Sequence, residues 1–260
     1  MIASAGIFSA FRPVAPAAES FDAPAPAVRE TVVRERNLDR FTRINSRGST
    51  SVTYIQSNVS KVVITGSPEF VDRMVTEVRG GTLHIGMEKG SYRNLDLRVT
   101  VYSPVLDEVV ISGSGVFRDE NGHISSGDVK YVSSGSGRFV IGKLKCGSFD
   151  CHLSGSGRLN VASLVCTDAL LCSSGSGGIT VENLVSRNDV NIRLSGSGYG
   201  LIDSVETGDL NMQISGSGSV KINGRARDVS VVISGSGSVM GDLEYRHLSP
   251  RISGSGRVRL

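Results

Sequence analysis

Acidic side chains recur at one place in a repeated pattern of this sequence. Aspartate stands six residues before a Ser-Gly-Ser-Gly tetrapeptide in five of seven repeats, and the first of the five is Asp128. If the repeats stack, the carboxylates form a ladder in which neighbours repel unless a cation or solvent neutralises them. Asx turns, in which each carboxylate accepts local backbone N–H groups, explain the same pattern. We therefore expect no metal site. The weak candidate for one is the ladder formed by Asp168, Asp189, Asp209 and Asp228.

The repeated serines are not spaced for nucleophilic catalysis. A catalytic serine needs a neighbouring base, and no histidine recurs with the period of the serines. The histidines are dispersed, have no metal-ligand spacing and pair with no repeating acid. Each is therefore expected to be a surface or strand residue: His84, His123, His152 and His247. We expect no catalytic residues and no cofactor.

Four cysteines lie within one stretch of the chain. Cys146 and Cys166 are twenty residues apart, so they fall on neighbouring repeats, where a disulfide is conceivable although stacked strands hold the Cβ atoms slightly too far apart. Cys151 falls in an inward column and Cys172 in an outward one, which does not bring all four together around zinc. Free or core cysteines are the default expectation.

Arginine recurs at one outward position of the repeat. Arg138 and Arg158 share a column, and they form either a solvated face or a contact for an anionic glycan. A polysaccharide-cleaving site would need acids and a base clustered on one outer face. No such cluster occurs among the outward residues, which are Arg138, Val140, Arg158, Asn160, Thr180, Tyr199, Lys221 and Met240.

All of these residues are positioned by a repeat of about twenty residues. The tetrapeptide occurs eight times, at spacings of 22, 20, 20, 21, 20, 19 and 19 residues. A fixed period in this range is typical of architectures in which each unit buries its apolar face by stacking on the next. The copies begin at Ser112, Ser134, Ser154, Ser174, Ser195, Ser215, Ser234 and Ser253.

Apolar residues alternate with polar ones on both sides of each tetrapeptide, which indicates two strands per repeat with one buried face each. We predict an all-β fold, a parallel β-helix with about eight coils; a meander of antiparallel hairpins is the rival. Glycine permits positive φ and close backbone approach at a tight corner. The expected corner glycines are Gly113, Gly135, Gly155, Gly175, Gly196, Gly216, Gly235 and Gly254.

The sequence before the repeats divides into two parts. Residues 1–36 are expected to be a leader followed by a flexible tether rich in proline and alanine. Residues 37–111 are expected to be an irregular β segment that starts or caps the stack of residues 112–260, with a hairpin at Gly80 and Gly81. The expected strands are Phe41–Asn45, Ser51–Gln56, Lys61–Thr65, Val75–Val78, Thr82–Ile85 and Leu95–Tyr102.

Composition excludes some classes of partner. The net charge of +3, with 20% charged residues, gives no strong attraction to nucleic acid. No run of 18 apolar residues occurs, so no transmembrane helix is expected.

We expect the last coil of the stack to have an open edge. Either Arg257 and Arg259 discourage edge pairing there, or that coil pairs with another subunit to form a homo-oligomer.

The ordered set of motifs resembles the autotransporter-adhesin head family, also called the head GIN domain. The resemblance covers about residues 36–260 and rests on the repeated Ile-Ser-Gly-Ser-Gly turns, on Gly80–Ile85, and on Val99–Pro104 leading into Val109–Gly113. It implies a right-handed superhelix of two sheets, similar in shape to pectin lyases. It also implies an adhesion or surface role in Gram-negative envelopes and no conserved catalytic set.

These observations favour a non-enzymatic, exported binding or scaffold protein with a rigid repeat surface. Its expected location is the periplasm, the outer-membrane surface or the extracellular space, and its expected partner is a glycan or protein. An anti-aggregation or envelope-scaffold protein without a ligand is a further reading. The alternative from another class is a polysaccharide-active enzyme, suggested by β-helix analogy alone.

Overall fold

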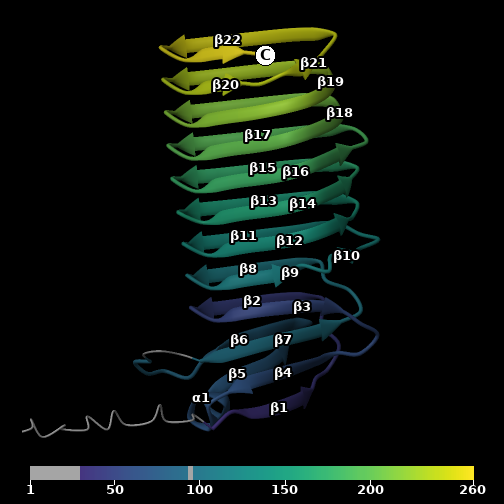
Figure 1. Cartoon of the computed structure of the whole chain (residues 1–260), viewed down its shortest axis with the longest axis vertical. Helices are drawn as coiled ribbons and strands as arrows, with labels where there is room; N and C mark the ends of the chain where they lie inside the picture. The colour runs from purple at the N-terminus through teal and green to yellow at the C-terminus, as the bar shows by residue number, and fades with distance from the viewer. Residues whose placement is uncertain (1–29, 93–95) are drawn as a thin grey trace, which may run out of the picture.

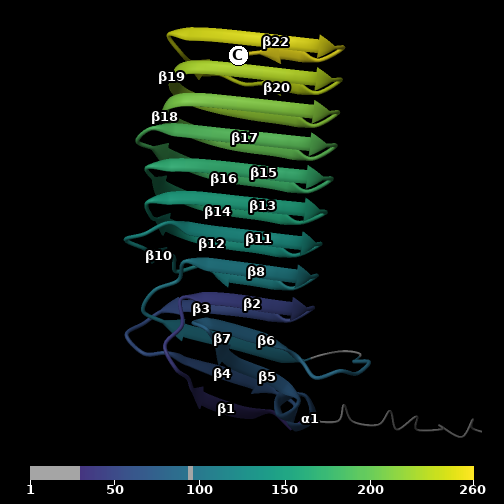
Figure 2. The same ribbon diagram turned by 180° about the vertical axis from the view of Figure 1, so that it is seen from behind.

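The tetrapeptide repeats stack as a β-solenoid of about eight turns in the computed structural model, which describes residues 30–92 and 96–260 (Figures 1 and 2). Each turn contributes a strand before the tetrapeptide and a strand after it. Consecutive turns are paired in parallel and in register, so that Ser154 and Gly155 lie beside Ser174 and Gly175. The rival antiparallel meander is therefore wrong for the repeats.

Two rows of parallel pairing run along the solenoid, and two long strands pass through both rows. The first row contains β8(Glu108–Gly113), β11(Val129–Gly135), β13(Ser148–Gly155), β15(Asp168–Gly175), β17(Asp189–Gly196) and β22(His247–Gly254). The second contains β9(Val116–Asp119), β12(Arg138–Lys145), β14(Arg158–Cys166), β16(Gly178–Ser186), β20(Ser238–Met240) and β23(Arg257–Arg259). The strands that share both rows are β18(Tyr199–Gly216) and β19(Ser219–Gly235), and the short additions are β10(His123–Ile124) and β21(Leu243–Glu244).

The core is a column of apolar side chains between the two rows. The inward positions predicted from the alternation are buried along the stack, as in the series Phe117, Phe139, Leu159 and Ile179. Near β8 and β9 the core is aromatic, with ring centroids of neighbouring Phe and Tyr side chains 5.0 to 6.3 Å apart. Because each turn contacts only its neighbours, the stack stabilises the turns collectively.

The first glycine of each tetrapeptide ends a strand with a backbone that other residues rarely adopt. Gly196 has φ of +113° and a Cβ placed on it would lie 2.6 Å from the Gly175 carbonyl oxygen one turn away. That oxygen accepts a hydrogen bond from the Ser197 N–H at 3.0 Å. Positive φ and this close approach both require glycine.

The segment before the repeats combines parallel and antiparallel pairing. It consists of β1(Val32–Asn37), β2(Arg43–Gly48), β3(Ser51–Gln56), β4(Lys61–Gly66), α1(Pro68–Asp72), β5(Met74–Arg79), β6(Thr82–Met87) and β7(Leu97–Ser103). β2 and β3 form a turn that lies between β6–β7 and β8–β9, so the order in the stack differs from the order in the chain. β5 and β6 form the predicted hairpin, in which Gly80 and Gly81 have positive φ.

Two local features differ from the sequence-based expectation. The short helix α1 was not expected among strands; Pro68 and the acidic Glu69 lie in its first turn, which suits a helix start. Most of the expected leader and tether lies outside the described residues, but β1 begins at Val32 and therefore occupies part of it. Arg36 of β1 donates hydrogen bonds to Met74 O at 2.6 Å and to Thr76 Oγ1 at 2.8 Å, which fixes this strand to the fold.

Across residues 30–92 and 96–260, no helix has the length and apolar character needed to cross a membrane.

Candidate functional site

The structure brings the candidate aspartates together in one row at the start of the first-row strands. Register pairing places Asp189 beside Asp209 and Asp209 beside Asp228, and Asp168 begins the preceding strand of the same row. His247 continues the row beyond Asp228. The columns of the sequence are therefore neighbours in space.

Basic groups of this chain pair with the last two aspartates of the row. Arg227 donates to Asp209 Oδ1 at 2.5 Å and to Asp228 Oδ2 at 2.9 Å, and His247 Nδ1 lies 2.8 Å from Asp228 Oδ1. The Arg227 hydrogen bond, followed by that of His247, lowers the pKa of Asp228. The part of the chain that the structure describes contains no group of three His, Cys, Asp or Glu side chains able to hold a metal ion. Asp209 and Asp228 are therefore paired within the chain, which does not favour a cation at this end of the row.

A different outward row forms a polar platform on the second row of strands. Arg138 of β12 is paired with Arg158 of β14, and Gly178 of β16 and Tyr199 of β18 continue the row. A Cβ on Gly178 would overlap the Tyr199 ring, so this glycine allows the ring to lie back over the neighbouring strand. Sequence reasoning listed the arginines and the tyrosine as outward residues but missed this contact, because the glycine's role depends on its neighbour one turn away.

We call Arg138, Arg158, Gly178 and Tyr199 the arginine–tyrosine platform. Arg138 and Arg158 are exposed residues, and Tyr199 is 39% exposed. A hollow of about 230 Å³ lies beside the platform on the next outward positions, and its lining includes Val140, Asn160 and Thr180 together with the carboxylates of Glu120 and Glu182. An arginine fork binds carboxylates in two hydrogen bonds, and an aromatic ring offers a flat face to an apolar surface. The arrangement suits binding of an anionic, ring-containing ligand.

The family is shown by comparison with known proteins. The family model described as "Putative auto-transporter adhesin, head GIN domain" matches residues 40–198 and 169–260. The chain belongs to the head GIN domain family. A comparison with curated proteins gives no match.

Solved structures show the same fold for this head GIN domain. A "putative adhesin" from Parabacteroides merdae has a TM-score of 0.77 at 20% identity, covering 89% of this chain and 96% of its own. A "putative adhesin" from Parabacteroides distasonis has a TM-score of 0.75 at 20% identity, covering 89% and 97%. A "Putative lipid binding protein" from the same species has a TM-score of 0.69 at 24% identity, covering 88% and 96%. None of these descriptions is that of an enzyme.

One histidine of the head GIN domain differs from the expectation that none pairs with a repeating acid, and a second pairs with an acid outside the repeat. His247 contacts Asp228 of the repeating row. His123 is buried, and its Nδ1 lies 2.5 Å from Asp119 Oδ2, with both side chains fully enclosed. Such a pair resembles the base and orienting acid of a hydrolase, but these two side chains have no exposed surface. The pair is a core feature, which local sequence patterns did not reveal because both residue types usually lie outside.

All four cysteines of the head GIN domain are free thiols in the structure. Cys146, Cys151 and Cys166 are buried, whereas Cys172 is partly exposed on an outward position. Burial raises the pKa of Cys146 to about 12 and that of Cys166 to about 11. Thiolate chemistry is therefore suppressed at the buried positions.

We expect stability to fall above pH 9. The thiols of Cys146 and Cys166 ionise near pH 9 when unfolded but only near 12 and 11 when folded, so the unfolded state releases protons first as pH rises. Stability is unaffected by these groups below pH 9 and decreases by about 1 kcal/mol per thiol at pH 10. Urea unfolding at pH 8 and pH 10 checks this. The Cys146→Ser/Cys166→Ser variant should lose less stability between these pH values. Serine suits the position because Ser186 already occupies the next place in this column. An equal loss of stability in variant and wild type would contradict the raised pKa of these thiols.

Proposed function

We propose that this head GIN domain is a non-enzymatic, exported binding protein that presents the arginine–tyrosine platform to an anionic glycan at the bacterial envelope or outside the cell. The observation that carries the proposal is the row formed by Arg138, Arg158 and Tyr199, in which Gly178 makes room for the ring. We further infer that the family's right-handed, two-sheet coil with glycine–serine corners is the rigid support of this face.

The charges of the platform support a carboxylated or sulfated ligand. Among the described residues, no carboxylate lies within ion-pair distance of Arg138 or Arg158, whereas Arg227 and Arg79 are each paired with acids. The backbones of Arg138 and Arg158 lie one strand spacing apart, ~4.8 Å, and neither guanidinium group is paired with an acid of the described chain. Two such groups can bind neighbouring oxygens of one anionic chain, while the Tyr199 ring packs against the apolar face of a sugar.

We expect the platform to bind an acidic polysaccharide without cleaving it. The full chain is titrated with polygalacturonate and with neutral dextran, and the polygalacturonate is then assayed for new reducing ends. The Arg138→Ala/Arg158→Ala variant and the Tyr199→Ala variant should each weaken binding about tenfold or more, equivalent to about 1.4 kcal/mol. The matched control is Arg193→Ala, because Arg193 is an exposed arginine in the first row of strands.

The outcomes separate the hypotheses. Binding that survives in both platform variants, or that is equally strong for dextran, contradicts the proposed site. New reducing ends that increase with time would instead favour the polysaccharide-active enzyme. Binding without cleavage that is lost only in the platform variants supports the proposal.

A further inference from the structure

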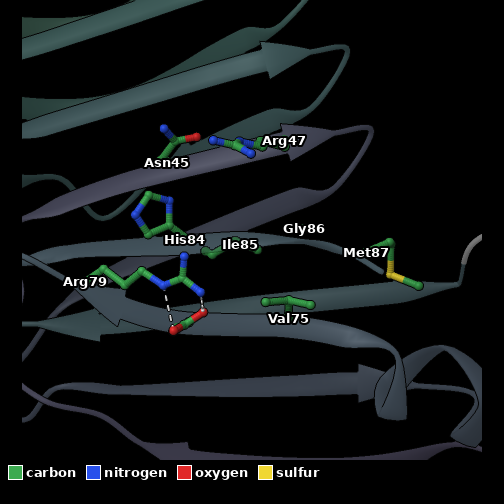
Figure 3. A pocket seen from close by; sticks show the side chains of 9 residues that line it. Asn45, Arg47, Val75, Arg79, His84, Ile85, Gly86 and Met87 are labelled. Carbon is green, nitrogen blue, oxygen red and sulfur yellow. Dashed lines mark hydrogen bonds and ion pairs between the residues drawn. The ribbon is translucent and has the colours of Figure 1, made fainter. Parts of the chain in front are cut away.

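A second hollow, of about 260 Å³, lies on the outer face of β2, β5 and β6 (Figure 3). Regular strand pairing builds it: His84 of β6 is paired with Asn45 of β2 on one side and with Glu77 of β5 on the other. Two residues further along β6, Gly86 is paired with Val75 of β5. The hollow therefore rests on three strands, whose backbone hydrogen bonds hold its lining in place.

The fold does not require a glycine at position 86. A Cβ on Gly86 would meet only ordinary contacts, with Arg47 Cβ at 3.7 Å and Arg47 O at 3.9 Å, and the backbone has no positive φ. By contrast, a Cβ on Gly113 would lie 2.5 Å from the Gly48 carbonyl oxygen. Glycine inside a strand weakens it and often marks a place where a ligand approaches closely. Because position 86 has no side chain, the floor of the hollow is open there.

One of the two arginines in the hollow is already paired. Arg79 donates from Nε and Nη2 to the two carboxylate oxygens of Glu77, each at 2.6 Å. This pairing lowers the pKa of Glu77. Across residues 30–92 and 96–260, no carboxylate lies within ion-pair distance of Arg47, the second arginine. Arg47 is therefore the cationic group that is available to an incoming anion.

The remaining lining offers both polar and apolar contacts. The Asn45 amide lines the hollow, and its Oδ1 has no hydrogen-bond partner among the described residues. That oxygen is enclosed, so the contact that the hollow offers to a ligand is with the amide group of Asn45 as a whole. Val75 and Met87 form an apolar part of the lining, at the side of the hollow where Gly86 lies (Figure 3).

We propose that this hollow binds a single acidic sugar residue of the uronate class. Its carboxylate pairs with Arg47, a ring hydroxyl contacts the Asn45 amide, and the C–H face of the ring packs against Val75 and Met87 over Gly86. The volume of about 260 Å³ is enough to hold about one sugar ring. This site is separate from the arginine–tyrosine platform, and neither proposal depends on the other.

The test uses the full chain and glucuronate, with glucose and acetate as probes that lack the carboxylate and the ring, respectively. We expect saturable binding of glucuronate with a Kd of about 1 mM, reported by shifts of the His84 ring resonances in NMR spectra. Glucose and acetate should bind at least about tenfold more weakly. Absence of saturable His84 shifts with glucuronate would overturn the proposal, as would equal shifts with glucose.

Two variants test whether glucuronate binds in this hollow. Gly86→Val fills the floor with a side chain that strands favour and should weaken glucuronate binding at least tenfold without lowering the melting temperature. Arg47→Ala should do the same by removing the cation, and it keeps the test decisive if Gly86→Val folds poorly. Unchanged affinity in Arg47→Ala would overturn the proposal. The control is Arg193→Ala, because Arg193 is an exposed arginine that lines neither hollow, and this variant should bind glucuronate as the wild type does.

Discussion

Gly196→Val is expected to destabilise the solenoid by about 4 kcal/mol or more. Gly196 has φ of +113°, a conformation that costs a β-branched residue about 1–3 kcal/mol, and the new Cβ would lie 2.6 Å from the Gly175 carbonyl oxygen. Relief of this overlap must separate two turns and break the hydrogen bond from Ser197 N to that oxygen. Overpacking adds about 1–3 kcal/mol, and the lost hydrogen bond adds about 1 kcal/mol.

Circular dichroism during thermal and urea unfolding measures this loss. The matched control is Gly127→Val, because Gly127 is exposed, has no positive φ, and a Cβ there would meet only Ser125 Oγ at 3.9 Å. The control should stay within about 1 kcal/mol of wild type. A Gly196→Val protein as stable as the Gly127→Val protein would refute the requirement for glycine at this turn.

The regular part of the fold could be predicted because one pattern is repeated eight times. The same columns hold apolar residues in each repeat, so the parallel register of β11 to β19 follows from alignment of the sequence with itself. The solenoid was predicted on this basis and is confirmed. The order of β2–β3, β6–β7 and β8–β9 could not be predicted in the same way. Each strand was visible locally, but strand patterns alone do not say which distant strand becomes the partner.

The candidate binding residues were predicted only where they belong to columns. Arg138 and Arg158 were found because they share an outward position, whereas the role of Gly178 depends on the Tyr199 ring that covers it. Gly86 gave no signal for a similar reason. A glycine that is required by the backbone and one that leaves a hollow look the same in sequence, and only the space around a placed Cβ distinguishes them.

The buried pair of Asp119 and His123 is the least predictable feature of the core, because it interrupts an apolar column. Tyr54 packs edge-on against His123 with ring centroids 5.4 Å apart, and the Tyr54 hydroxyl donates to Ser103 O at 3.0 Å. Within the described chain, Asp119 Oδ1, His123 Nε2 and the Tyr131 hydroxyl lack hydrogen-bond partners. Unpaired buried polar atoms are commonly satisfied by an internal water molecule. Removal of either Asp119 or His123 would leave the other side chain buried without its partner, so the two side chains depend on each other.

Asp119→Ala is expected to destabilise the protein by about 3–5 kcal/mol, because it leaves His123 buried without its partner. His123→Leu should cost a similar amount, since it leaves the Asp119 carboxyl group enclosed and unpaired. Urea unfolding of both single variants and of Asp119→Ala/His123→Leu forms a double-mutant cycle. The double variant should lose less stability than the sum of the single variants, because it removes both polar groups from the apolar core. Strictly additive losses would show that the two side chains do not stabilise each other. The exposed neighbour Glu120→Ala is the control and should remain within about 0.5 kcal/mol of wild type.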